Sequence, residues 1–223
     1  MSLILLAILG GLLALDGTSV GQVMVSRPLV AGVLAGWVIG DPLLGLLIGG
    51  ILEVYFISVF PVGGAEFPEG GPPALVAVAT GAAVPEAADM AAGIALGVLM
   101  GFIWSRIGSG SVKALRHLNG RLVPDPSRRE VSQARIVWAH LAGIGLDFVR
   151  GFLLSVGGLM FGPWLARTLA GQWPLGMPAT LGILAVGASL PAGAFVRSLG
   201  GWKRRAAFFA TGLMGFLVGS VLL

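Results

Sequence analysis

The sequence lacks cysteine altogether and carries few of the motifs that mark enzymes. Without cysteine there is no disulfide framework, no thiol nucleophile and no cysteine-ligated zinc or iron–sulfur site. The sequence also has no GxxxxGK[ST] phosphate-binding loop and no HExxH zinc motif. We therefore expect no catalytic residue, no metal site and no bound cofactor.

Charge is scarce as well. Charged residues make up 11% of the 223 residues, whereas 56% are hydrophobic and the mean hydropathy is +0.94. A soluble domain has about 25% charged residues, and a disordered chain is poor in apolar residues. Glycine is abundant, with 37 residues, but it follows no Gly-X-Y period, so a collagen helix is excluded. This composition is typical of a polytopic membrane protein with closely packed helices.

The basic residues are concentrated in two stretches. Seven of the 14 lie in residues 106–135 and four more in residues 197–205. Pro124 and Pro126 interrupt the first stretch, so we predict a basic loop there, between helical halves 1–105 and 136–223 of a single transmembrane domain, 1–223. The positive-inside rule predicts that this loop is cytoplasmic. We interpret the second cluster as a topology anchor beside membrane lipid, with no nucleic acid as partner.

Apolar runs fill the rest of the chain, and several are too short to span a bilayer, which takes about 20 residues. They cover residues 3–15, 29–39, 43–60, 74–84, 91–104, 136–161, 178–196 and 206–223. We expect the first to be a retained helix, since no basic region precedes it. Breaks at glycine, proline and acidic residues predict an all-α membrane protein with re-entrant or discontinuous helices. Ordinary spanning helices with kinks are the alternative.

Glu53 is the most informative acidic residue. It stands in residues 44–60, which hold no other charge, and a charge at the bilayer centre costs at least roughly 2.5–3.5 kcal/mol. Gly49 and Gly50, one turn earlier, leave space beside it. We interpret Glu53 as a ligand-binding or pathway residue; a buried ion pair with Arg27 is the alternative.

Two other segments carry candidate binding residues. Glu69 and Glu66 lie in a Gly- and Pro-rich segment, either a cavity lining or an exposed loop. Asp16 and Gln22 bracket a polar break, and an amide such as Gln22 both donates and accepts hydrogen bonds. Arg27 follows this break, where it can pair with an acid or mark an interface.

The remaining polar residues have structural interpretations. Asp41, before Pro42, reads as a helix N-cap, and Glu86 and Asp89 as acids of a first helical turn. Asp147 and Arg150 can pair at i,i+3. His140 lies on the same helical face without a second histidine nearby, so we interpret it as a packing residue.

An ordered set of short motifs carries a family resemblance. Ser26-Arg27-Pro28-Leu29, Gly40-Asp41, Gly49-Gly50-Ile51-Leu52-Glu53 and Pro68-Glu69 follow one another. Together they resemble the IIC membrane subunit of the mannose/fructose/sorbose family of the bacterial phosphoenolpyruvate-dependent sugar phosphotransferase system. The resemblance covers roughly residues 16–80.

The resemblance implies a permease that moves a hexose-type sugar across the bacterial inner membrane, which it crosses several times. It implies an IID membrane subunit and IIA and IIB phosphocarrier proteins as partners, with IIB phosphorylating the sugar. It further implies three IIC–IID pairs and an elevator-like movement. The substrate-binding candidates are Glu53, Glu69, Gln22, Arg27 and Asp16.

Two other function classes remain open from the residues alone. A stand-alone proton- or ion-coupled secondary transporter would use membrane carboxylates as proton carriers. A non-transporting assembly subunit would bind partners without any saturable ligand.

Overall fold

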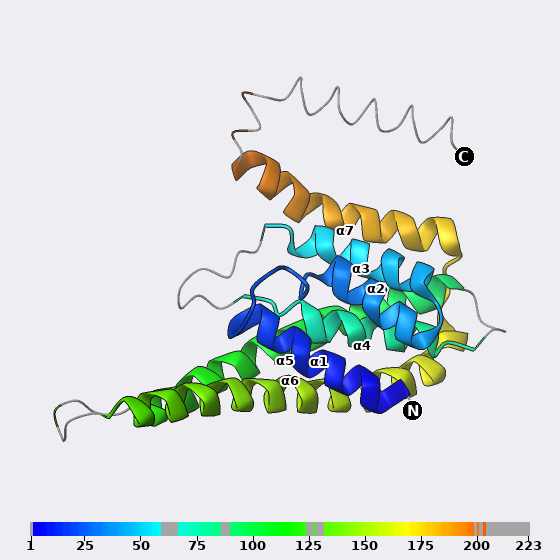
Figure 1. Cartoon of the computed structure of the whole chain (residues 1–223). Helices are drawn as coiled ribbons and strands as arrows, with labels where there is room; N and C mark the ends of the chain where they lie inside the picture. Colours follow the sequence, from blue (N-terminus) through cyan, green and yellow to red (C-terminus); the bar gives the residue numbers. More distant parts are fainter. Residues whose placement is uncertain are drawn as a thin grey trace.

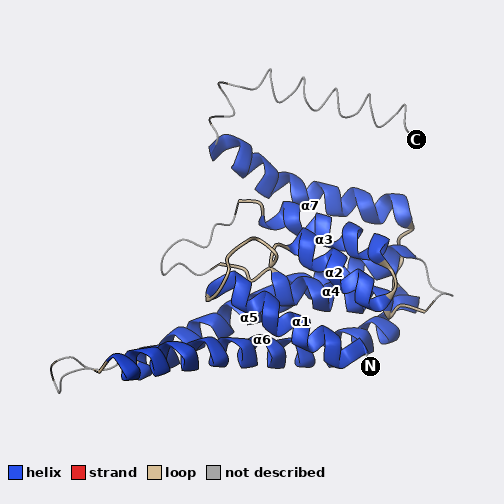
Figure 2. Ribbon diagram, viewed as in Figure 1, coloured by secondary structure: helices blue, strands red, loops and turns tan. Residues whose placement is uncertain are grey.

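The computed structural model describes residues 2–58, 67–85, 90–123, 127, 132–198, 200 and 203. Within these residues the chain forms α-helices and one 3-10 helix and no strand, which confirms the all-α prediction (Figure 2). The helices are α1 (Ser2–Thr18), α2 (Pro28–Ile39), α3 (Pro42–Phe56), α4 (Gly71–Ala82), α5 (Met90–Leu122), α6 (Gln133–Leu169), η1 (Ala170–Gln172) and α7 (Met177–Ser198).

Helices α2 and α3 form a tight hairpin that is too short to span a bilayer. At 1.5 Å per residue their 12 and 15 residues extend about 18 and 22 Å, against a hydrocarbon core of about 30 Å. Proline occupies the first turn of each helix, where the missing N–H costs no hydrogen bond. Asp41 caps α3 as predicted, since its Oδ1 accepts from the backbone N–H of Leu44 at 2.9 Å. This hairpin matches the re-entrant geometry that the sequence predicts.

Glycine allows the two helices of the hairpin to touch along their backbones. A Cβ at Gly32 would collide with the carbonyl oxygen of Gly45, and one at Gly49 with that of Pro28. The Gly45-xxx-Gly49 spacing thus has the packing role expected of small-xxx-small pairs.

Helix α4 is the centre of the bundle. Residues 74–78 are fully buried, and α4 contacts α1, α2, α3, α5 and α6 (Figure 1). Because all its sides face protein, its sequence shows no polar face. The segment just before α4 therefore leads directly into the most buried helix of the bundle.

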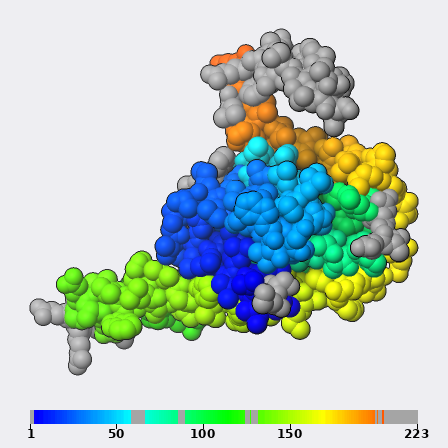
Figure 3. Space-filling model, turned by 45° about the vertical axis from the view of Figure 1, so that its right-hand side comes forward, coloured from blue at the N-terminus to red at the C-terminus, as the bar shows by residue number. Residues whose placement is uncertain are grey.

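Helices α5 and α6 continue beyond the bundle as a projecting pair, the arm (Figures 1 and 3). Their 33 and 37 residues correspond to about 50 and 55 Å, longer than a membrane crossing needs. Most of the stretch predicted as a basic loop is therefore helical, with only residues 123–132 between the two helices. Arg, Lys and Leu are good helix formers, so a change from apolar to basic sequence does not end a helix. That the arm is cytoplasmic stays a prediction.

Among the described residues, three helices have the length and composition to cross a membrane: Met90–Leu122, Gln133–Gln172 and Met177–Ser198. The last, α7, packs lightly on α3 and α5 and leaves Leu190 78% exposed. A hydrogen bond links α3 to α7: the hydroxyl of Tyr55 donates to the carbonyl of Leu184 at 3.0 Å. The predicted run 206–223 lies outside the described residues.

Candidate functional site

A small recess opens where helices α1, α2 and α4 begin or end. Its volume is about 70 Å³. Its lining comes from the end of α1, the start of α2, the end of α3 and the segment before α4: Leu13, Gly17, Thr18, Ser26, Arg27, Pro28, Phe56, Phe67, Pro68, Glu69, Gly70 and Gly71. The predicted binding segments around Asp16, Arg27 and Glu69 therefore converge on one place.

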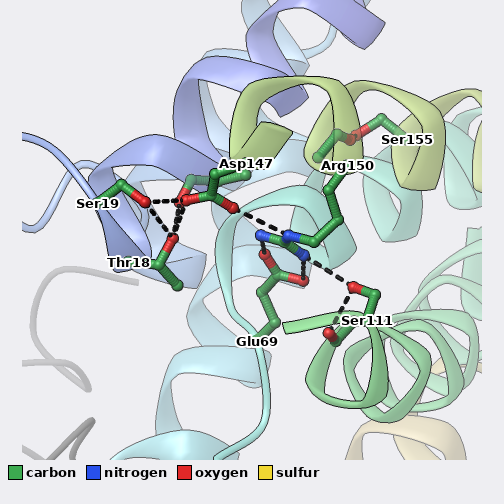
Figure 4. Close-up of polar contacts among 10 residues, drawn as sticks. Thr18, Ser19, Glu69, Ser111, Asp147, Arg150 and Ser155 are labelled. Carbon is green, nitrogen blue, oxygen red and sulfur yellow. Dashed lines mark hydrogen bonds and ion pairs between the residues drawn. The ribbon is translucent and has the colours of Figure 1, made fainter. Parts of the chain in front are cut away.

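Glu69 lies in the wall of this recess in a bidentate ion pair with Arg150 of α6. Nη2 of Arg150 donates to Oε1 at 2.8 Å and Nη1 to Oε2 at 3.0 Å (Figure 4). Glu69 is 4% exposed, and the side chain of Arg150 is 9% exposed. The carboxylate is thus held in one orientation by a planar fork that matches its shape.

Arg150 also holds a second carboxylate. Its Nε donates to Oδ1 of the fully buried Asp147 at 2.9 Å, which confirms the predicted i,i+3 pair. Oδ2 of Asp147 accepts from the hydroxyls of Thr18 and Ser19 at the end of α1. The sequence did not link Glu69 with Arg150, because the two residues stand 81 positions apart and no local spacing joins them.

Gly108 of α5 makes room for this arrangement. A Cβ at Gly108 would collide with the carboxylate of Glu69. The backbone N–H of Glu69 also donates to the carbonyl of Ser105, at 3.4 Å. The segment before α4 therefore lies directly against α5.

Glu53 forms an ion pair with Arg27, as the alternative interpretation held. Nε of Arg27 donates to Oε1 of Glu53 at 2.7 Å, Nη2 contacts the same oxygen, and the backbone N–H of Leu29 donates to Oε2 at 3.3 Å. The side chains of Arg27 and Glu53 are 32% and 20% exposed. Arg27 lines the recess and Glu53 holds Arg27, so direct contact of Glu53 with a ligand stays a prediction.

Asp16 lies near the end of α1, and Gln22 lies in the turn between α1 and α2. Oδ1 of Asp16 accepts from the backbone N–H of Val23 at 2.8 Å, and Oδ2 from that of Ser26 at 2.7 Å. Gln22 is exposed, has a positive φ of 52°, and its Nε2 donates to the carbonyl of Thr18 at 3.4 Å. Asp16 thereby fixes the backbone of Ser26 at the recess, while Gln22 stands at the outside of the turn.

The other polar candidates lie elsewhere. His140 borders a separate cavity of about 360 Å³ together with Ser19 and Asn119. In the part of the chain that the structure describes, no group of three metal-ligating side chains occurs. Glu66, Glu86 and Asp89 lie outside the described residues.

Residues 17–21, Gly-Thr-Ser-Val-Gly, have the Gly-x-Ser-x-Gly spacing of a nucleophile elbow. The structure does not support that chemistry. The segment begins in the last residues of helix α1 and does not follow a strand, and the hydroxyl of Ser19 donates directly to Asp147. In a catalytic triad a histidine stands between serine and acid.

The family follows from comparison with known sequences. The sequence model described as "PTS system sorbose-specific iic component" matches residues 1–196 of the 223. The chain belongs to this family. It is therefore a membrane protein of the sorbose-specific IIC type, a membrane component of a phosphotransferase-system sugar permease, as the motifs predicted.

Two solved structures share the fold. A chain described as "Structure of membrane protein" aligns with a TM-score of 0.67 and 19% identity, over 99% of this chain and 94% of that one. A chain of the cryo-EM structure of the mannose transporter ManYZ in complex with microcin E492 aligns with a TM-score of 0.61 and 18% identity, over 98% and 86%. A search of curated proteins gives no significant match.

Proposed function

We propose that this IIC chain moves a hexose-type sugar inward across the bacterial inner membrane, where a partner IIB protein phosphorylates it. An IID membrane subunit and the IIA and IIB phosphocarriers are its partners, in an assembly of three IIC–IID pairs. The observation that carries the proposal is Glu69, a buried carboxylate held by Arg150 in the wall of a recess formed by helix ends.

The recess offers the groups that a neutral sugar needs. Each oxygen of Glu69 accepts one hydrogen bond from Arg150 and keeps lone pairs for a sugar hydroxyl. Arg27 supplies donors, and the hydroxyl of Ser26 both donates and accepts. A sugar carries no charge, so this set binds it without a coupled ion.

The size of the recess sets a condition on transport. At about 70 Å³ it is smaller than the ~300–1,000 Å³ of typical ligand pockets. Sugar entry therefore requires the start of α2 and the segment before α4 to separate. An alternating-access cycle that opens and closes the recess satisfies this condition.

The stand-alone proton-coupled transporter has less support. Glu53, Glu69 and Asp147 are each held in an ion pair with an arginine, so none of the three is an unpaired carboxylate in the structure. Sugar uptake by the purified IIC chain alone in liposomes, driven by a pH gradient, would favour that alternative.

The test is sugar uptake and phosphorylation by the complete complex in membrane vesicles. Glu69→Gln should lower the affinity for labelled sorbose or mannose at least about tenfold, as loss of one charge-assisted hydrogen bond implies. Asp41→Asn is the matched control, because Asp41 caps α3 away from the recess and asparagine also caps. Unchanged affinity in Glu69→Gln would remove the recess from the proposal.

A further inference from the structure

The guanidinium of Arg150 contacts Glu69 in the wall of the recess, Asp147 on α6 and Ser111 on α5. We propose that Arg150 is a positioning residue for sugar binding: it sets the orientation of Glu69 and, through Asp147, that of Thr18. The inference rests on the proposed sugar-binding role of the recess.

The first step is the donor geometry of Arg150. Nη1 and Nη2 reach the two oxygens of Glu69, Nε reaches Asp147, and Nη1 also donates to the hydroxyl of Ser111 at 2.8 Å. Four of the five N–H donors of the guanidinium are therefore in use. A lysine ammonium has three donors and no planar fork, so it cannot reproduce these contacts.

The second step is the chain of contacts that joins two residues of the recess lining. Thr18 and Glu69 both line the recess. Thr18 donates to Asp147, Asp147 accepts from Arg150, and Arg150 holds Glu69 (Figure 4). Two lining residues from different segments are thus connected behind the recess through the side chains of Asp147 and Arg150.

The third step concerns charge. Glu69 and Asp147, both buried, supply two negative charges against the single positive charge of Arg150, whose side chain is 9% exposed. Removal of Arg150 would leave two adjacent buried carboxylates without a cation, and folding itself would suffer. A variant that keeps the charge but loses the fork separates positioning from folding.

That variant is Arg150→Lys in the complete IIC–IID complex, assayed in vesicles with labelled sorbose and, as a second probe, labelled mannose. Positioning predicts a KM raised about tenfold, while Vmax per folded complex changes about twofold or less. Arg167→Lys is the matched control, since Arg167 is an exposed arginine of the same helix. A purely structural role predicts less folded complex with an unchanged KM, and that result would overturn the inference.

A milder variant covers the case in which Arg150→Lys does not accumulate. Ser111→Ala removes one contact of Arg150 and leaves both ion pairs in place. It should raise KM about threefold without loss of folded protein, as a modest hydrogen-bond contribution implies. An unchanged KM in folded Ser111→Ala, with Arg150→Lys not accumulating, would count against positioning.

The two proposals fail in different ways. If Glu69→Gln keeps the wild-type KM, the recess does not bind sugar and the proposed function fails. If Glu69→Gln raises KM but folded Arg150→Lys does not, the sugar site stands and Arg150 does not position it.

Discussion

Gly108 and Glu69 lie so close that a side chain at position 108 would displace the carboxylate. The clash of a Cβ at Gly108 is with the Glu69 side chain itself. The glycine in α5 and the acid in the segment before α4 therefore depend on each other. This contact leads to a test that leaves every charge in place.

Gly108→Ala should raise the KM for sugar while the protein remains folded, because alanine favours the helix by about 1 kcal/mol but pushes Glu69 off its position. Gly110→Ala is the matched control, since it lies on the same helix with nothing within 4 Å of an added Cβ. The measurement is sugar uptake against concentration in vesicles. Equal KM values for the two variants would show that the position of Glu69 does not matter.

The α2–α3 hairpin is predicted to depend on one of two neighbouring glycines. A Cβ at Gly49 would collide with the backbone oxygen of Pro28, whereas one at Gly50 would make an ordinary contact with the side chain of Leu29. Gly49→Ala should therefore destabilise the protein by about 1–3 kcal/mol, the usual effect of overpacking. Gly50→Ala should be close to neutral. Thermal unfolding of the two purified variants decides this, and equal midpoints would contradict the backbone-to-backbone packing.

The N-cap of α3 gives a third prediction. Asp41→Ala should cost about 1 kcal/mol of stability, because the backbone N–H of Leu44 loses its acceptor. Asp41→Ser should keep most of the stability, as serine also caps helices. A thermal shift that is the same for both variants would mean that the cap does not stabilise the hairpin.

A fourth prediction concerns which residue of the Glu53–Arg27 ion pair contacts the sugar. If Glu53 acts by holding Arg27, then Glu53→Gln should weaken sugar binding less than Arg27→Gln does. The double variant should bind about as weakly as Arg27→Gln alone, because the two changes are coupled. Equilibrium binding of labelled sorbose to the purified complex measures all three. A larger loss in Glu53→Gln than in Arg27→Gln would show that Glu53 contacts the sugar directly.

Local patterns predicted much of this structure. The Asp41-Pro42 pair located the start of α3, and the i,i+3 spacing identified the pair Asp147 and Arg150. Each of these features involves residues within one turn of helix. A single sequence therefore contains all the information that they require.

Long-range contacts were harder to predict. The pairing of Glu69 with Arg150 depends on how α4, α5 and α6 pack, and no spacing within the sequence encodes it.

The helical arm was not predicted either. Basic residues indicate contact with water, but the backbone there remains helical as far as Leu122. Glu53 was chosen as the leading ligand residue because it is the one charged residue in an apolar run. The ion pair with Arg27 accounts for a charge at that position equally well.

The absence of native cysteine makes a direct test of the sugar site possible. Ser26→Cys places one thiol in the recess, and Ser189→Cys places one on the exposed part of α7 as a control. The measurement is the rate of maleimide labelling in the purified IIC–IID complex, with and without sorbose or mannose. Sugar should slow labelling at position 26 and leave position 189 unaffected; unchanged labelling at position 26 under sugar concentrations that saturate uptake would contradict a sugar site in this recess.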